Sequence, residues 1–331
     1  MKAVEEKRVE HKHNSDATSN PCRRLTISVP GSTTNLGPGF DSLGLALSIY
    51  SRFTFQVLES DEPTIPRITL LRGAEGLSTG EDNLVFRVLQ EALTGNEALL
   101  ARLRLTIETD IPLARGLGSS STAILSALWA SRMLTGGEPS RQEVLTEAAG
   151  IEGHPDNVAA SLLGGLIVSA PSRNGRRALT QRLAWPEKWR TLVVVPGYGL
   201  STEMARRALP KIVPLKEAVA NVQRTALLVA AIANADDEAL AEALEDRLHE
   251  PYRSHLVPEL SDLKRQLKYK SALGCVLSGA GSSILVIVDD YHKRDILSFL
   301  NSWAAAQAHA PAVLDLSVDM QGLRAGYDDI G

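Results

Sequence analysis

The sequence has few of the features that mark secreted, membrane and nucleic-acid-binding proteins. Its 331 residues include only two cysteines, Cys22 and Cys275, which is too few for a disulfide framework and favours a reducing compartment. No apolar run reaches the roughly 18–20 residues that a membrane-spanning helix needs, and residues 1–20 lack the apolar core of a secretory signal. The net charge of -4 and the lack of a long basic block argue against nucleic-acid binding. We therefore expect a cytoplasmic protein that binds neither membranes nor nucleic acid.

What is present is the composition of a folded globular protein. Hydrophobic residues make up 44% of the chain and charged residues 22%, and the length suggests two domains. Residues 1–23 are polar and charged, which predicts a disordered tail. We place an N-terminal domain at residues 24–188 and a C-terminal domain at residues 189–331, because a new buried strand pattern begins at residue 191. Strand and helix patterns are mixed without regular alternation, which favours an α+β fold.

Hydrophobic periodicity predicts the main strands and helices. Alternating or continuously apolar runs predict strands at residues 25–29, 53–57, 102–108, 166–169, 191–195, 275–277 and 284–288. Apolar residues at helical spacing predict helices at residues 83–93, from residue 119 onward, at 215–233 and at 236–248. Residues 110–118 are expected to form a loop between a strand and a helix.

The loop before the helix at residue 119 has the composition of a phosphate-binding turn. Gly116 and Gly118 allow a sharp turn and a close approach of the backbone to a ligand. Ser119, Ser120 and Ser121 fall in the first helical turn, whose unpaired N–H groups and positive dipole end attract phosphate. The loop has neither the Walker A lysine nor the Rossmann glycine spacing. From these residues alone, a glycine turn followed by serine capping of an ordinary helix is an equal alternative.

The same segment, residues 111–122, resembles the Pro-x-x-x-Gly-Leu-Gly-Ser-Ser signature of the GHMP kinases, the superfamily of galactokinase, homoserine kinase and mevalonate kinase. Every signature position is met. The resemblance implies that the loop wraps the phosphates of ATP and that Ser120 ligates Mg²⁺. It assigns to ATP binding the residues Pro112, Leu113, Ala114, Arg115, Gly116, Leu117, Gly118, Ser119, Ser120, Ser121 and Thr122.

A second segment, residues 29–47, resembles the first sequence motif of the homoserine kinases within that superfamily. It contains Asn-Leu-Gly-Pro-Gly-Phe-Asp, preceded by Gly31, Thr33 and Thr34 where Ala, Ser and Ala are commoner. The resemblance implies that Asn35 and Asp41 bind a small polar substrate, for which an amide and a carboxylate have suitable donors and acceptors. Without it, the two side chains could instead close an Asx-type turn in a Gly-Pro-Gly loop.

Residues 152–165 resemble the Glu-Gly-His-Pro-Asp-Asn-Val-Ala-Pro segment of homoserine kinases, with an alanine at position 160 where proline is common. The resemblance implies that Glu152 ligates Mg²⁺, an ion that prefers oxygen ligands. Some family members have a longer segment between this glutamate and the histidine, so Glu147 is the alternative ligand. The resemblance further implies that His154, Asp156 and Asn157 line the homoserine pocket. A lone histidine is otherwise usually structural.

A glycine-rich segment at residues 277–284 resembles the third motif of the family, Ser-Gly-Ala-Gly-Pro-Thr. Gly279 and Gly281 are retained, so close backbone approach to the ATP phosphates is expected. Ser282 and Ser283 replace proline and threonine, which predicts a more flexible loop. The alternative is an ordinary glycine-rich hairpin.

Two further segments resemble those that supply substrate-binding residues in the family. Ser-Thr-Glu-Met-Ala-Arg at residues 201–206 contributes Thr202 and Arg206, and Glu-Pro-Tyr-Arg at residues 250–253 contributes Arg253. A guanidinium forms a bidentate pair with a carboxylate, so we expect the two arginines to clamp the carboxylate of an amino acid. The alternative is ordinary solvated arginine, which is the interpretation we give to Arg207.

Taken together, the resemblance implies a two-domain GHMP kinase fold of the α+β class, with an ATP-binding N-terminal domain and a ferredoxin-like C-terminal half. It implies transfer of phosphate from ATP to the side-chain hydroxyl of L-homoserine in threonine biosynthesis, with ATP and Mg²⁺ as cofactors. The catalytic candidates are Asp41, Asp156 and Asn157, and whether a protein base is needed is left open. A homodimer is also left open. The alternatives are another small-molecule kinase of this superfamily, such as a mevalonate or sugar kinase, and a catalytically silent ligand-binding regulator.

Overall fold

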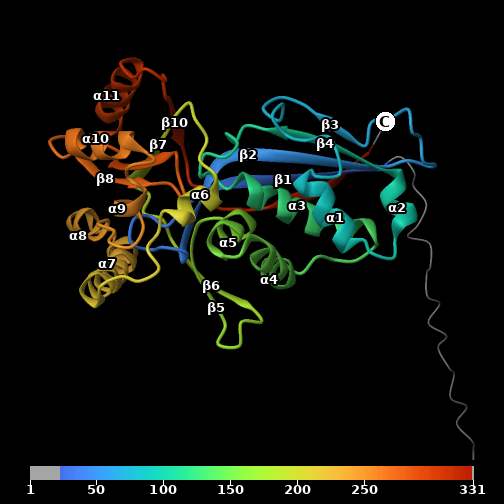
Figure 1. Ribbon diagram of the computed structural model, residues 1–331, viewed down its shortest axis with the longest axis horizontal. Helices are drawn as coiled ribbons and strands as arrows, with labels where there is room; N and C mark the ends of the chain where they lie inside the picture. The colour runs from blue at the N-terminus through green and yellow to red at the C-terminus, as the bar shows by residue number, and fades with distance from the viewer. Residues whose placement is uncertain (1–22, 330–331) are drawn as a thin grey trace, which may run out of the picture.

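The computed structural model describes residues 23–329 of the chain (Figure 1). The predicted disordered tail therefore lies outside the described residues, except for Arg23, which begins the first strand. No helix within residues 23–329 is both long enough and apolar enough to cross a membrane.

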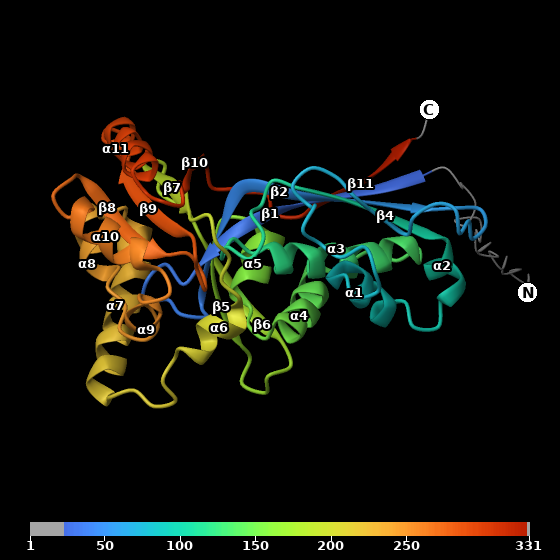
Figure 2. The same ribbon diagram turned by 45° about the horizontal axis from the view of Figure 1, so that its top comes forward.

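The larger of two sheets has seven strands, in the order β11-β1-β2-β4-β3, and β5 joins it through β2 and pairs in turn with β6. Its strands are β1 (Arg23–Thr34), β2 (Leu43–Val57), β3 (Ile68–Leu70), β4 (Leu103–Thr109), β5 (Leu166–Pro171), β6 (Ala178–Leu183) and β11 (Arg324–Asp329). The helices of this half are α1 (Leu84–Ala92), α2 (Glu97–Arg102), α3 (Ser119–Leu134), α4 (Arg141–Glu152) and α5 (Asp156–Leu163). Figure 2 shows that these helices lie on one side of the long strands.

The alternation of residues along the strands explains this one-sided packing. Phe53 and Phe55 of β2 are buried in the core that α1 and α3 complete, together with Leu105 of β4. Arg52, just before them, is exposed and Thr54, between them, is half-buried, as expected for an antiparallel sheet with only one face covered.

The second sheet has four antiparallel strands in the order β10-β7-β9-β8. They are β7 (Trp189–Val195), β8 (Ala272–Leu277), β9 (Ile284–Asp289) and β10 (Ala312–Leu316). The accompanying helices are α6 (Thr202–Arg207), α7 (Leu215–Asn234), α8 (Asp237–Ala243), α9 (Glu250–Arg253), α10 (Pro258–Leu267) and α11 (Lys293–Ala305). Strand β7 is followed by helices, then β8, β9, α11 and β10, which is the ferredoxin-like arrangement that we expected.

Both faces of this second sheet are buried, so its strands are continuously apolar rather than alternating. Val193 of β7 packs into a core that also contains Leu228 of α7 and Leu45 and Leu47 of β2. The neighbouring Val194 faces the opposite core, beneath α10 and α11. The first of these cores joins the two sheets.

The predicted boundary between residues 188 and 189 falls between β6 and β7, where the chain passes from the first sheet to the second. The division into residues 24–188 and 189–331 stays a prediction. It did not anticipate that β11 returns to the first sheet and pairs antiparallel with β1, with Leu25 opposite Tyr327. This return is visible in Figure 2, where β11 runs beside β1.

One predicted helix is wrong in length. The pattern indicated a helix over residues 236–248, but α8 ends at Ala243 and a turn leads into α9. The Asp246 carboxylate accepts hydrogen bonds from the backbone N–H groups of Leu248, His249 and Glu250. These local bonds replace helical ones, which is how aspartate competes with a continuing helix.

Candidate active site

A cavity of about 240 Å³ lies where the two sheets meet. Its walls come from the β1–β2 loop, the loop before α3, the turn between α4 and α5, helices α6 and α9, and the β8–β9 loop. Of the residues assigned from the sequence, it is lined by Asn35, Asp41, Ala114, Arg115, Gly116, Gly118, Ser119, Ser120, Glu152, His154, Asp156, Asn157, Thr202, Arg206, Arg253 and Gly279. The fold therefore brings together motifs that are far apart in the chain, such as those of Asn35 and Gly279, which are 244 residues apart.

The sequence assignments and the cavity lining differ at several positions. The lining also includes Thr34, Phe40, Leu200, Ser201 and Ala280, which the sequence did not assign. These residues could have been identified from their position in the sequence, because each lies inside or beside a recognised motif. Pro112, Leu113, Leu117, Ser121, Thr122 and Gly281 are not among the lining residues. Leu117 packs in the core and the Thr122 hydroxyl donates to the Ser119 carbonyl, and for these positions ATP contact stays a prediction.

The phosphate loop has the backbone geometry that its glycines suggested. Gly116 and Gly118 have φ values of 73° and 74°, in the left-handed region that favours glycine. A Cβ atom on Gly116 would lie 2.2 Å from the Ser278 carbonyl oxygen, so the third motif packs directly on this loop.

Helix α3 begins at Ser119 without a side-chain cap. In the described part of the chain, the N–H groups of its first three residues donate no hydrogen bond, and the first donor is the N–H of Thr122, to the Gly118 carbonyl. Because these donors stand at the cavity with the positive end of the helix dipole, they fit an anionic phosphate group.

The two predicted magnesium ligands are in contact. The Ser120 hydroxyl donates to Glu152 Oε1 at 2.6 Å, and both residues line the cavity. The alternative ligand, Glu147, instead pairs with Arg132 at 2.5 Å and is not among the lining residues. A hydroxyl and a carboxylate oxygen are suitable donors for Mg²⁺, which usually takes one or two protein ligands besides phosphate oxygens. This donor set fits the ion.

The loop between β1 and β2 is closed by its own side chains. Asn35 Oδ1 accepts from the N–H of Asp41 at 3.0 Å, and its Nδ2 donates to the Gly279 carbonyl at 2.8 Å. Asn35 and Asp41 both have positive φ values, 71° and 55°, and such backbone strain is often found at functional sites. Asn35 therefore closes the turn, as the alternative interpretation proposed, and it also lines the cavity. Both its amide oxygen and its amide nitrogen already form hydrogen bonds to protein groups.

Asp156 is a buried carboxylate at the start of α5, with 1% of its surface exposed. Its Oδ1 lies 2.6 Å from His154 Nδ1 and accepts from the N–H of Asn157 at 2.8 Å. Burial alone would lower the pKa of His154, but the hydrogen bond and the negative charge of Asp156 outweigh it and raise that pKa. The Asn157 side chain bonds to the hydroxyls of Ser32 and Thr34.

Both predicted clamp arginines line the cavity, but their guanidinium groups have different electrostatic surroundings. The Arg206 guanidinium forms a bidentate pair with Asp41, at 2.9 and 3.1 Å. Arg253 is only 2% exposed, and burial together with the positive charge of Arg206 lowers its pKa to about 10. The ring of Phe40 contacts both, with guanidinium carbons 5.7 Å (Arg206) and 5.4 Å (Arg253) from its centroid. Arg253 is therefore not an ordinary surface arginine, whereas Arg206 already has a carboxylate partner.

A second cation-binding arrangement is formally present. One ligand atom each of Asp41, His154 and Asp156 lies within 4.8 Å of the others. Asp41 is tied to the Arg206 guanidinium, and Asp156 also accepts from the Asn157 N–H, whereas Ser120 and Glu152 are bonded to each other. Ser120 and Glu152 remain the better candidates.

Comparison with known proteins agrees with this geometry. The model of the GHMP kinases N terminal domain matches residues 83–165, and the GHMP kinases C terminal model matches residues 228–306. The homoserine kinase of Synechocystis sp. is 38% identical over 304 residues, which are 90% of this chain and 97% of that protein. The homoserine kinase of Synechococcus sp. strain WH7803 is 40% identical over 272 residues, 80% of this chain and 84% of that protein.

Comparison with solved structures agrees with the sequence comparison. The homoserine kinase from Cytophaga hutchinsonii superposes with a TM-score of 0.79 at 26% identity, covering 91% of this chain and 97% of that one. A mevalonate kinase structure superposes with a TM-score of 0.64 at 13% identity, covering 89% of this chain and 99% of that one, a likeness of fold alone. The chain therefore belongs to the homoserine kinase family of the GHMP kinases.

Proposed function

We propose that the protein phosphorylates the side-chain hydroxyl of L-homoserine with ATP to give O-phospho-L-homoserine, a step of threonine biosynthesis. One observation carries this proposal beyond family membership. A single cavity holds both an uncapped helix start beside the Ser120–Glu152 pair and the buried cation of Arg253. The first fits nucleotide phosphates, and the second fits the carboxylate of an amino acid.

The N–H groups at the start of α3 bind and orient the phosphates, and Ser120 and Glu152 would hold Mg²⁺. The chemistry that Mg²⁺ supplies when bound is neutralisation of phosphate charge. The acceptor's hydroxyl oxygen bonds to the γ-phosphorus, the bond to the bridging oxygen of ADP breaks, and the hydroxyl proton is released.

Asp156 and Asn157 stand at the same wall of the cavity as Glu152. We infer that Asp156 accepts a hydrogen bond from the acceptor hydroxyl and so aligns it for in-line attack. His154, hydrogen-bonded to the same carboxylate, orients it. Asn35 and Asp41 shape the acceptor side of the cavity through their bonds to Gly279 and Arg206.

The proposal is tested by ADP release with homoserine, mevalonate, galactose and no acceptor. We expect release to depend on homoserine and to stay near the acceptor-free rate with the other two. Faster turnover of mevalonate or galactose would assign the protein to another activity of the superfamily. ATP binding without turnover of any acceptor would favour a silent regulator.

The Glu152→Gln variant is expected to need a higher magnesium concentration for half-maximal rate, by at least the roughly 10–100-fold that the loss of an outer-shell partner of a metal ligand typically costs, because a neutral amide replaces a charged oxygen ligand. Glu147→Gln is the matched control and should leave the magnesium dependence unchanged, since Glu147 pairs with Arg132 outside the cavity. Magnesium titrations of both variants measure the effect. A shift in the Glu147 variant alone would mean that the metal-binding glutamate is misassigned.

The cytoplasmic location and the lack of nucleic-acid binding stay predictions, as does the homodimer. The oligomeric state is measured by light scattering coupled to size-exclusion chromatography.

A further inference from the structure

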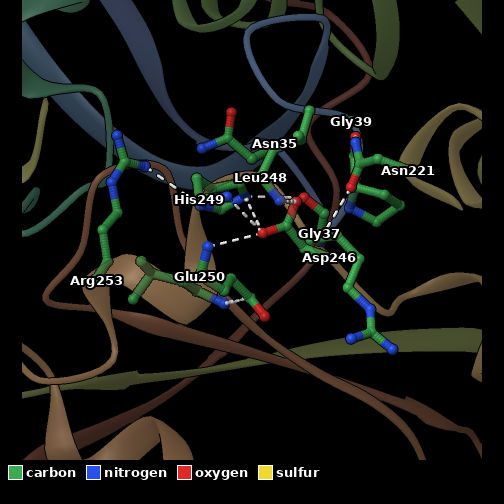
Figure 3. Close-up of polar contacts among 12 residues, drawn as sticks. Asn35, Gly37, Gly39, Asn221, Asp246, Leu248, His249, Glu250 and Arg253 are labelled. Atoms are coloured by element: carbon green, nitrogen blue, oxygen red, sulfur yellow. Dashed lines mark hydrogen bonds and ion pairs between the residues drawn. The ribbon is translucent and has the colours of Figure 1, made fainter. Parts of the chain in front are cut away.

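A buried polar cluster lies behind Arg253 and connects it to the loop of residues 35–41 (Figure 3). Its centre is His249, which has no exposed surface and does not line the cavity. His249 Nε2 lies 2.9 Å from the Gly37 carbonyl oxygen, and its Nδ1 lies 3.3 Å from Nη1 of Arg253. The imidazole thus bridges the loop of residues 35–41 and the buried guanidinium of Arg253.

The two neighbours determine the protonation of the ring. A carbonyl oxygen only accepts hydrogen bonds, and a guanidinium only donates them. His249 must therefore carry its proton on Nε2, to donate to Gly37, and leave Nδ1 free to accept from Arg253. Burial lowers the pKa of His249 and keeps the ring neutral, against the opposing charges of Asp246 and Glu250.

The backbone around His249 is held by Asp246. This carboxylate accepts the N–H groups of Leu248, His249 and Glu250, at 2.7 to 3.1 Å, and Figure 3 shows these bonds beside the imidazole. Its Oδ2 lies 3.8 Å from His249 Nε2, beyond hydrogen-bond distance. Asp246 thus fixes the turn that interrupts the predicted helix.

The opposite side of the cluster is equally constrained. Asn221 and Thr225 of α7 both donate to the Pro38 carbonyl, at 2.7 and 2.8 Å. The ring of Phe40 stacks on His249, with centroids 5.1 Å apart and planes inclined by 22°. Helix α7 therefore holds the loop of residues 35–41 through Pro38, and the imidazole holds the same loop through Gly37 and Phe40.

We propose that His249 is a positioning residue that sets the Arg253 guanidinium for the carboxylate of the acceptor and couples this orientation to the conformation of the loop of residues 35–41. The remaining bonds of Arg253 go to main-chain carbonyls of Ala205 and Gly279. His249 is the side chain that accepts from it among the described residues, so it determines how the guanidinium fork is turned. The proposal rests on the proposed function only for the identity of the acceptor.

Two substitutions separate positioning from packing. His249→Phe keeps an aromatic ring against Phe40 but removes both hydrogen bonds. His249→Gln retains one donor and one acceptor on its amide and should recover part of the loss. His255→Gln, at an exposed histidine of the same segment, is the control and should behave as wild type.

We expect His249→Phe to raise KM for homoserine by about tenfold, the equivalent of one charge-assisted hydrogen bond, while KM for ATP is unchanged. The loss should be smaller for 3-aminopropan-1-ol, which lacks the carboxylate. In an Arg253→Ala background, the same change should cost no more than about twofold, because residues that act as a unit are not additive. Equal losses for both acceptors, or additive losses in the double variant, would overturn the proposal.

The tautomer is measured on the wild-type protein, so the test does not depend on a variant that folds. Long-range ¹H–¹⁵N NMR of the imidazoles should show His249 as the neutral Nε2–H form at pH 7. An Nδ1–H or doubly protonated ring would contradict the proposal. Because this measurement needs no acceptor, its outcome is independent of whether homoserine is the substrate.

Discussion

The Ser120→Ala variant is expected to turn over about 100-fold more slowly than the wild-type protein, or worse, with its fold intact. The Ser120 hydroxyl contacts Glu152 at 2.6 Å, where the uncapped start of α3 meets the cavity. Its removal takes away a proposed magnesium ligand at the place where the phosphate charge must be neutralised, and the expected effect on the rate is therefore large. Because Ser120 is exposed, its removal leaves no buried void, and we expect little change in thermal stability.

Steady-state turnover and thermal unfolding of the variant measure both parts of this prediction. Ser126→Ala is the matched control, since Ser126 lies in the same helix, is buried and donates only to the Ala123 carbonyl. It should keep the wild-type rate. Wild-type turnover of Ser120→Ala at saturating magnesium would mean that the start of α3 is not the phosphate site.

The Arg253→Ala variant is expected to lose about 10–100-fold in kcat/KM for homoserine. Charge-assisted hydrogen bonds contribute roughly 1.5–3 kcal/mol each, and about 1.4 kcal/mol corresponds to a tenfold change. Arg253 is the arginine of the proposed clamp whose guanidinium is not already paired with a carboxylate among the described residues, in contrast to Arg206 with Asp41. Arg206→Ala should also lower kcat/KM, in part by releasing Asp41.

The acceptor that lacks the carboxylate provides the decisive comparison for this prediction. 3-Aminopropan-1-ol should be a poor acceptor for the wild-type protein and should lose little more in Arg253→Ala, while KM for ATP stays unchanged. Arg207→Ala is the control, because Arg207 is exposed and pairs with Glu203. Equal losses for both acceptors would show that Arg253 acts on the phosphates or on folding, and not on a carboxylate.

The motifs were predictable because they depend on local backbone chemistry. Gly116 and Gly118 could be expected to adopt left-handed conformations before a helix, and both do. The start of α3 at Ser119 followed from the same pattern. Local patterns failed where a side chain diverts the backbone, as Asp246 does when it ends the predicted helix early by accepting three N–H groups.

The choice between candidate residues required the tertiary structure. Glu147 and Glu152 lie on one helix and cannot be distinguished by composition, but only Glu152 is directed to the cavity and to Ser120. The clamp of two equivalent arginines was a reasonable expectation from charge. The structure makes them unequal, since Arg206 is paired with Asp41 and Arg253 is buried against His249.

Family membership could be inferred from the resemblance of the motifs, and the α+β fold and most of the residues around the cavity followed because each motif has its own turn, strand or helix start. Three features emerged only from the folded chain: which of those residues share a hydrogen bond, which are already bound to another side chain, and the return of the last strand to the first sheet. The physical reason is that hydrogen bonding and burial join residues far apart in the chain, such as Gly37, His249 and Arg253, and no local periodicity records such pairings.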